Sequence, residues 1–283
     1  MQGKTVVYLL ADRYPQLRLP IRTGMKDTSE YQNAVLRGIP FSGEPDFIGS
    51  EEDRFTVMET PAGKVEILYL AKREDFEHAF RALAYRCEPV DILPSVGAST
   101  MIGLINWEKI NRHKEEYLSS GGMDWNEEFE RFTAEKSNYR DTIILLSAGF
   151  YSNILAETVG LNEDEWKEKS LIIRKYHELT HFVCRRIYSN DIDSIRDEVF
   201  ADCVGLVAAF GKYNPSLACE FLGIEKEGFR PGGRLSHYVE EEELPKSIDK
   251  AREIIDFCKT KVNGWNDQDV FSLIFALMDH ESR

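Results

Sequence analysis

The sequence of 283 residues lacks a hydrophobic run long enough to cross a membrane. Its apolar stretches, such as Thr142–Phe150 and Val204–Phe210, fall far short of the roughly 18–20 residues that a membrane-spanning helix needs. The apolar patch Val6–Leu10 is followed directly by Asp12 and Arg13, which is too soon for the core of a secretory signal peptide. We therefore expect a soluble protein without a membrane span.

Cysteine is scarce and is not arranged in pairs. The chain has five cysteines, an odd number, and no Cys-x-x-Cys sequence. A framework of disulfides needs paired cysteines and an oxidising compartment. Because no export signal is evident either, we predict a cytoplasmic protein.

Positive charge is also in short supply. Lysine and arginine together number 35 against 49 acidic residues, which gives a net charge of −14 at pH 7. Non-specific nucleic-acid binding requires clustered basic residues, so we predict no nucleic-acid partner. With 42% hydrophobic and 30% charged residues, the composition is that of a globular protein. The length allows one large domain or two lobes.

Local patterns divide the chain into a mixed first half and a helical second half. Two β-branched, alternating runs, Arg54–Glu59 and Lys64–Leu70, flank Thr60-Pro61-Ala62-Gly63 and indicate a β-hairpin. The other elements predicted before residue 140 are a strand at Lys4–Leu10, helices at Thr28–Arg37, Lys72–Cys87, Met101–Tyr117 and Trp125–Lys136, and a loop at Ser95–Thr100. We predict an α+β fold, with a region of unknown role at 1–140 and a mainly helical region at 141–283, or one continuous two-lobed domain.

The second half begins with a predicted strand, Thr142–Ser147, which is either an edge strand or an internal strand of the sheet. Asn162 and three acidic residues after it favour the start of a helix that runs from near Glu163 to near Tyr188. A polar break at Ser189–Asp191 precedes a second helix. The remaining predicted helices are Pro215–Leu222, Leu244–Val262 and Asp267–His280.

The long predicted helix carries the pattern His-Glu-x-x-His. His177 and His181 are four residues apart and therefore share one helix face, so their imidazoles can point to a common centre. Glu178 cannot bind that centre directly but can reach a water held there. Two imidazoles suit Zn²⁺, and a neighbouring carboxylate suits the general base of a zinc-assisted hydrolysis.

The second predicted helix supplies two carboxylates at helical spacing. Glu198 and Asp202 are four residues apart and lie on one face, which Gly205 continues. Glu198 would be the third metal ligand, and Asp202 would orient a ligand histidine by accepting its second ring proton. A purely solvated acidic face is disfavoured because apolar residues flank the pair. Asp197 is a weaker candidate for the ligand because Ala201 takes the place of an acidic partner four residues later.

The combination of His-Glu-x-x-His with Glu-x-x-Ala-Asp resembles the gluzincin metallopeptidases. It is most similar to the CAAX prenyl endopeptidases and bacterial membrane heat-shock proteases. The resemblance covers about residues 165–215 and implies a zincin-like fold, zinc on His177, His181 and Glu198, Glu178 as general base and Asp202 behind the ligands. This chain departs from that family because it has no transmembrane helix. A metzincin would need Gly at Cys184 and His at Ile187.

Zincin chemistry also needs a donor for the developing oxyanion. The glycine-rich segment Phe229–Tyr238 offers His237, Tyr238 and Arg234, of which His237 is our first choice. In zincins, the substrate backbone pairs with an edge strand, a role open to Thr142–Ser147.

These observations favour a soluble zinc-dependent hydrolase whose substrate is a peptide or protein. A second hypothesis is a non-catalytic regulatory or binding protein stabilised by the metal. The unassigned first 140 residues favour this second hypothesis, and the intact Glu178 opposes it. Hydrolysis of a non-peptide amide is a third option.

Overall fold

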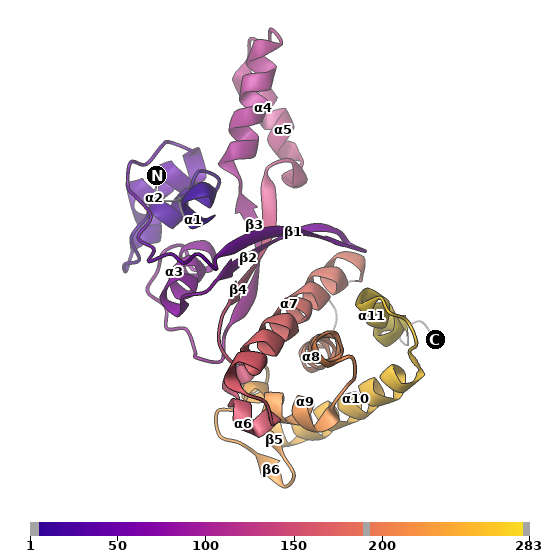
Figure 1. The fold of residues 1–283 in the computed structure, drawn as a ribbon. Coiled ribbons are helices and arrows are strands. Elements are labelled where there is room, and N and C mark those ends of the chain that lie inside the picture. The colour runs from indigo at the N-terminus through magenta and orange to yellow at the C-terminus, as the bar shows by residue number, and fades with distance from the viewer. Residues whose placement is uncertain (1–5, 189–192, 280–283) are drawn as a thin grey trace. The chain divides into compact units, whose positions relative to one another are not determined.

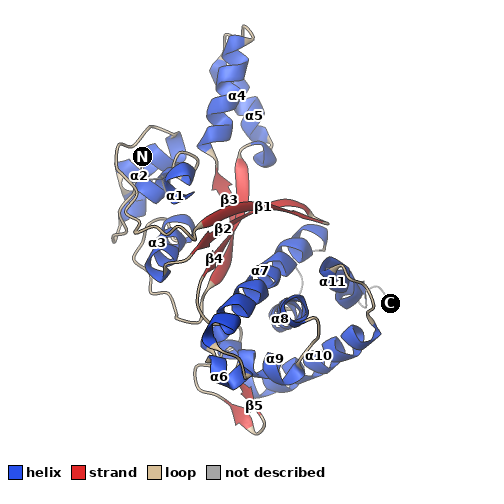
Figure 2. Cartoon of the chain, viewed as in Figure 1, coloured by secondary structure: helices blue, strands red, loops and turns tan. Residues whose placement is uncertain are grey.

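The computed structural model describes residues 6–188 and 193–279, which form two compact units. The first unit comprises residues 1–57, 65–92 and 99–147, and the second comprises 58–64, 93–98 and 148–283. The first unit contains a four-stranded sheet with helices beside it, and the second unit is mainly helical (Figure 2). The α+β class predicted from the sequence is therefore confirmed.

The first unit contains a four-stranded sheet with the strand order β1-β2-β4-β3. Its strands are β1 (Arg54–Thr60), β2 (Gly63–Leu70), β3 (Ala98–Ile105) and β4 (Arg140–Ser147). The hairpin of β1 and β2 was predicted and is confirmed. Strands β2 and β4 are parallel, with Glu66 opposite Ile143. Because β4 lies between β2 and β3, it is an internal strand, and the alternative role of an edge strand is wrong.

Helices accompany this sheet in the first unit (Figure 1). Helices α4 (Trp107–Ser119) and α5 (Trp125–Ala134) pack against each other as a helical hairpin. The helical elements are α1 (Val6–Leu10), η1 (Pro15–Arg18), η2 (Met25–Asp27), α2 (Ser29–Tyr31), the π-helix η3 (Gln32–Leu36), α3 (Arg73–Ala84), α4 (Trp107–Ser119), α5 (Trp125–Ala134) and η4 (Lys136–Asn138).

Two predictions in the first unit are wrong. Val6–Leu10 is helix α1 and not a strand, while Lys4 and Thr5 lie outside the described residues. The buried residues Val7 and Leu10 are three positions apart and share one face of this helix. Residues 98–105 form strand β3 instead of a loop and the start of a helix. The helix begins only after Asn106, whose side chain accepts a hydrogen bond from the Lys109 amide and caps the start of α4.

The second unit is built around α8 (Ser194–Phe210), which packs against α7 (Glu163–Ile187), α10 (Leu244–Gly264) and α11 (Val270–Met278) (Figure 1). The break at Ser189–Asp191 lies outside the described residues. The remaining elements are η5 (Tyr151–Asn153), α6 (Ala156–Val159), α9 (Pro215–Leu222), β5 (Ile224–Glu225), β6 (Gly228–Phe229), η6 (Arg234–His237) and η7 (Glu241–Glu243).

Helices α7 and α8 approach each other closely at Gly205. A β-carbon at this position would lie 2.9 Å from the carbonyl oxygen of Ile173. Asn162 caps α7 by accepting a hydrogen bond from the Glu165 amide, and three acidic residues occupy the first turn. Local capping thus sets where α7 begins, and a small residue on α8 lets the two helices meet.

Candidate metal centre

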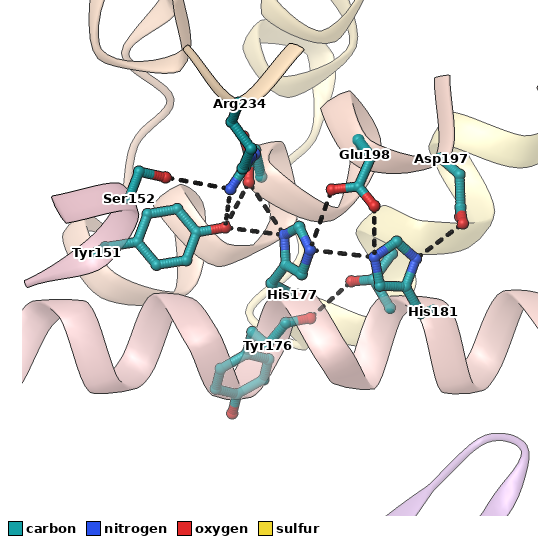
Figure 3. Close-up of polar contacts among 10 residues, drawn as sticks. Tyr151, Ser152, Tyr176, His177, His181, Asp197, Glu198 and Arg234 are labelled. Atoms are coloured by element: carbon teal, nitrogen blue, oxygen red, sulfur yellow. Dashed lines mark hydrogen bonds and ion pairs between the residues drawn. The ribbon is translucent and has the colours of Figure 1, made fainter. Parts of the chain in front are cut away.

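Helix α7 presents both histidines of the His-Glu-x-x-His pattern to the interior of the second unit. His177 and His181 are buried, and their Nε2 atoms lie 3.0 Å apart (Figure 3). The spacing of four residues produces this pairing, because one helical turn separates the two side chains on one face. Glu178, between them in sequence, is also buried.

Helix α8 adds Glu198 to this pair. The Oε2 atom of Glu198 lies 3.4 Å from His177 Nε2, and its Oε1 atom lies 3.5 Å from His181 Nε2. One ligand atom from each of the three residues falls within 4.8 Å of the others. The structure therefore brings together the three residues that the sequence selected as ligands, in a group able to hold a metal ion.

Each imidazole has a carboxylate on its other nitrogen. Asp202 Oδ1 lies 3.0 Å from His177 Nδ1. Asp197 Oδ2 lies 2.8 Å from His181 Nδ1 (Figure 3). A carboxylate only accepts hydrogen bonds, so His177 Nδ1 carries a proton. The negative charge of Asp197 favours a proton on His181 Nδ1 as well. In neutral rings, both Nε2 lone pairs then face the same point beside the Glu198 carboxylate. Three converging electron pairs are the arrangement that a cation stabilises.

Asp202 is the centre of a second layer of contacts. It accepts a 2.6 Å hydrogen bond from the hydroxyl of Tyr151 and forms an ion pair with the Arg234 guanidinium. Arg234 also donates to the Tyr151 hydroxyl, at 2.9 Å, and to Ser152 Oγ, at 3.2 Å. Sequence reasoning placed Asp202 behind a ligand histidine and proposed Arg234 as an oxyanion donor. The structure places the guanidinium against Asp202.

Two residues of this layer, Tyr151 and Asp197, were not predicted for these roles. Tyr151 follows β4 in an irregular segment, and no motif marks it. Asp197 was considered only as a rival ligand, although its position directly before Glu198 was a usable signal. An acidic residue next to a ligand on a helix is rotated by about 100°, which lets it approach the same imidazole from another side.

The electrostatics of the cluster follow from burial and these carboxylates. Burial lowers the pKa of His181, but Asp197 and Glu198 outweigh burial and raise it to about 10. Burial also disfavours the charged form of His177, yet its hydrogen bonds to Asp202 and Glu198 raise its pKa. Burial would raise the pKa of Glu198, but the two imidazoles hold it well below its ordinary value. Protons therefore stabilise this cluster in the metal-free protein, and a cation bound here would have to displace them.

The segment after β6 contains the three predicted oxyanion donors, which differ in their burial and in their neighbours. Tyr238 lies beside Glu198; burial raises the pKa of its hydroxyl, and a hydrogen bond to Glu198 raises it further. His237 is exposed and lines a pocket of about 480 Å³ together with Arg234 and Ser152. Of the three candidates, Tyr238 is the one whose hydroxyl lies beside a residue of the group that could hold a metal ion.

These contacts define a group of two histidines and one carboxylate, on two packed helices, that could hold a metal ion. The chain belongs to DUF7005, a family of unknown function whose match covers residues 1–263. No curated protein and no solved structure matches the chain. Across residues 6–188 and 193–279, no helix is both long and apolar enough to cross a membrane.

Proposed function

We propose that the protein is a zinc-dependent peptide hydrolase of the gluzincin type. The observation that carries this proposal is the convergence of His177, His181 and Glu198 next to the buried Glu178. Ligand atoms about 2.0–2.1 Å from a tetrahedral zinc ion lie roughly 3.3 Å from one another. The two Nε2 atoms lie 3.0 Å apart, Glu198 Oε2 lies 3.4 Å from His177 Nε2, and Glu198 Oε1 lies 3.5 Å from His181 Nε2. One ligand atom from each residue falls within 4.8 Å of the others. The donor set of two imidazoles and one carboxylate suits Zn²⁺.

The chain's own residues have distinct tasks in this proposal. A zinc ion held here would polarise a carbonyl and lower the pKa of water towards ~7. Glu178 accepts a proton from the attacking water and passes it to the leaving amine. Asp202 and Asp197 keep the Nδ1 protons of the two histidines in place, which leaves the Nε2 atoms to bind. Tyr238, beside Glu198, donates a hydrogen bond to the developing oxyanion.

The test combines metal analysis with turnover. We expect about one zinc ion per purified chain, defined cleavage of members of a diverse peptide library, and loss of cleavage when a chelator removes the metal. Restoring zinc should restore cleavage. Zinc binding without cleavage of any peptide would refute the hydrolase and favour a metal-stabilised binding protein. Failure to bind zinc would refute both.

A further inference from the structure

A continuous network of hydrogen bonds joins the segment at Arg234 to the metal-binding histidine His177. Its members come from four elements: Arg234 from η6, Tyr151 from η5, Asp202 from α8 and His177 from α7. Figure 3 shows Arg234, Tyr151 and His177 side by side. Tyr151 and Asp202 are buried, at 4% and 1% exposure, and Arg234 keeps only 11% of its side chain exposed. Water therefore has little access to compete for these contacts.

The donors and acceptors of this network allow one consistent arrangement. Arg234 can only donate, so the Tyr151 oxygen accepts its Nη1 proton and the Tyr151 hydroxyl proton points to Asp202 Oδ1. The other oxygen of Asp202 faces Arg234 Nη2. Asp202 Oδ1 and the Tyr151 oxygen, each 3.0 Å from His177 Nδ1, are both left as acceptors. The proton of His177 must then be on Nδ1, which directs the Nε2 lone pair to the metal position.

We propose that Tyr151 and Arg234 are positioning residues that hold His177 in its metal-binding tautomer and orientation without contacting the metal. This inference rests on the proposed metal centre and adds two residues that the sequence pattern does not mark for this role. The surroundings of His181 are different. Its Nδ1 atom is paired with Asp197, which directly precedes Glu198 on α8. The His177 half depends on contacts that are distant in sequence.

Electrostatics and positioning predict opposite results when Arg234 is removed. Loss of a positive charge near the site would by itself strengthen the binding of a cation. Loss of the hydrogen bonds frees the Asp202 carboxylate and the His177 ring to turn, which weakens binding. Removal of groups that orient a ligand typically costs 10–100-fold in metal affinity. A fall in affinity therefore reports positioning and not charge.

The first test uses Tyr151→Phe, which removes one hydroxyl and no charge. Zinc affinity is measured by competition with a chromophoric chelator, which needs no turnover. We expect affinity to fall about 10-fold or more. The matched control is Tyr213→Phe, because the Tyr213 hydroxyl is also buried but has no hydrogen-bond partner among the described residues. Equal zinc affinity in Tyr151→Phe and the wild-type protein would overturn the inference.

The second test is chemical rescue of Arg234→Ala. Arg234 lines the pocket of about 480 Å³, so a free guanidinium ion can reach the space that its side chain leaves. We expect zinc affinity to fall and millimolar guanidinium to restore part of it, whereas sodium at equal ionic strength should not. Arg230→Gln is the control, since Arg230 pairs with Glu220 in the same pocket. Unchanged or higher zinc affinity in Arg234→Ala would contradict the inference.

These outcomes separate the inference from the proposed function. If the wild-type chain does not bind zinc, the metal centre itself fails. If it binds zinc and both variants bind it equally well, only the positioning role fails. Circular dichroism shows whether each variant folds, and Tyr151→Phe, which keeps the aromatic ring, decides the question if Arg234→Ala does not fold.

Discussion

Asp197 and Glu198 are neighbours in sequence, yet they face opposite nitrogens of the same imidazole. Asp197 Oδ2 lies 2.8 Å from His181 Nδ1, and Glu198 Oε1 lies 3.5 Å from His181 Nε2. A single turn of α8 thus provides both a candidate ligand and a carboxylate placed to orient another candidate ligand. Because the two residues are adjacent in sequence, the helical spacing of four residues identified Glu198 as a candidate ligand but did not identify Asp197 as the partner of His181.

Substituting Asp197→Asn should affect zinc binding in two measurable ways. An amide keeps the size of the side chain but removes the charge that raises the pKa of His181. Fewer protons should therefore be released when zinc binds at neutral pH. Above the pKa of His181, where protons no longer compete, affinity should still fall about 10-fold because the ring is less well oriented. Calorimetry in buffers of different ionisation enthalpy measures both quantities, and unchanged proton release would contradict the assignment.

Stabilisation by zinc should increase with pH. In the metal-free protein, His181 has a raised pKa, so its contribution to stability is present below 6.5 and is lost as pH rises through about 10. Glu198 has a lowered pKa, so its contribution is present above 4.5 and is lost as pH falls below that value. Zinc must displace the imidazole protons. The zinc-induced rise in Tm should therefore grow between about pH 6 and about pH 9. A constant or shrinking rise would refute proton competition.

The core of the site was predictable because its signals are local. The pairs His177 and His181, and Glu198 and Asp202, follow from helical spacing, and the start of α7 follows from Asn162 and the acidic turn after it. The roles of Tyr151 and Arg234 were not predictable in this way. They depend on contacts between residues 83 positions apart, which no local pattern specifies.

The errors in the fold have a related cause. Val6–Leu10 and residues 101–105 are short apolar runs, and such runs fit a buried strand and a buried helix equally well. Whether such a run forms a helix or a strand depends on the residues elsewhere in the first unit that it packs against or pairs with. The place of β4 inside the sheet likewise depends on its pairing with β2, which the sequence of β4 does not reveal.

Gly205→Ala should loosen the contact between α7 and α8. Its β-carbon would lie 2.9 Å from the Ile173 carbonyl oxygen, so one helix must shift, at a cost of about 1–3 kcal/mol. Because the ligands come from both helices, zinc affinity should fall as well. Gly264→Ala is the control, since no atom lies within 4 Å of the added β-carbon. Denaturant unfolding of the metal-free protein measures the cost, and equal stability of the two variants would argue against this close approach.

Glu178→Gln should separate metal binding from turnover. The amide cannot accept the proton from the attacking water, but it leaves His177, His181 and Glu198 unchanged. We expect zinc content equal to that of the wild-type protein and a fall in kcat of at least about 100-fold. The control is Glu168→Gln, an exposed position on the same helix, which should keep full activity. Loss of zinc from Glu178→Gln would show that this residue is a ligand and not the base.

Tyr238→Phe and His237→Ala distinguish the two candidate oxyanion donors. Tyr238 lies beside Glu198, whereas His237 is exposed at the pocket that Arg234 lines. A donor that acts only on the developing charge affects kcat more than KM. We therefore expect Tyr238→Phe to lower kcat by about 10²–10³-fold with little change in KM, and His237→Ala to leave kcat within a few fold of the wild-type value. Steady-state kinetics on a cleaved library peptide measures both constants, and the reverse result would assign the donor to His237.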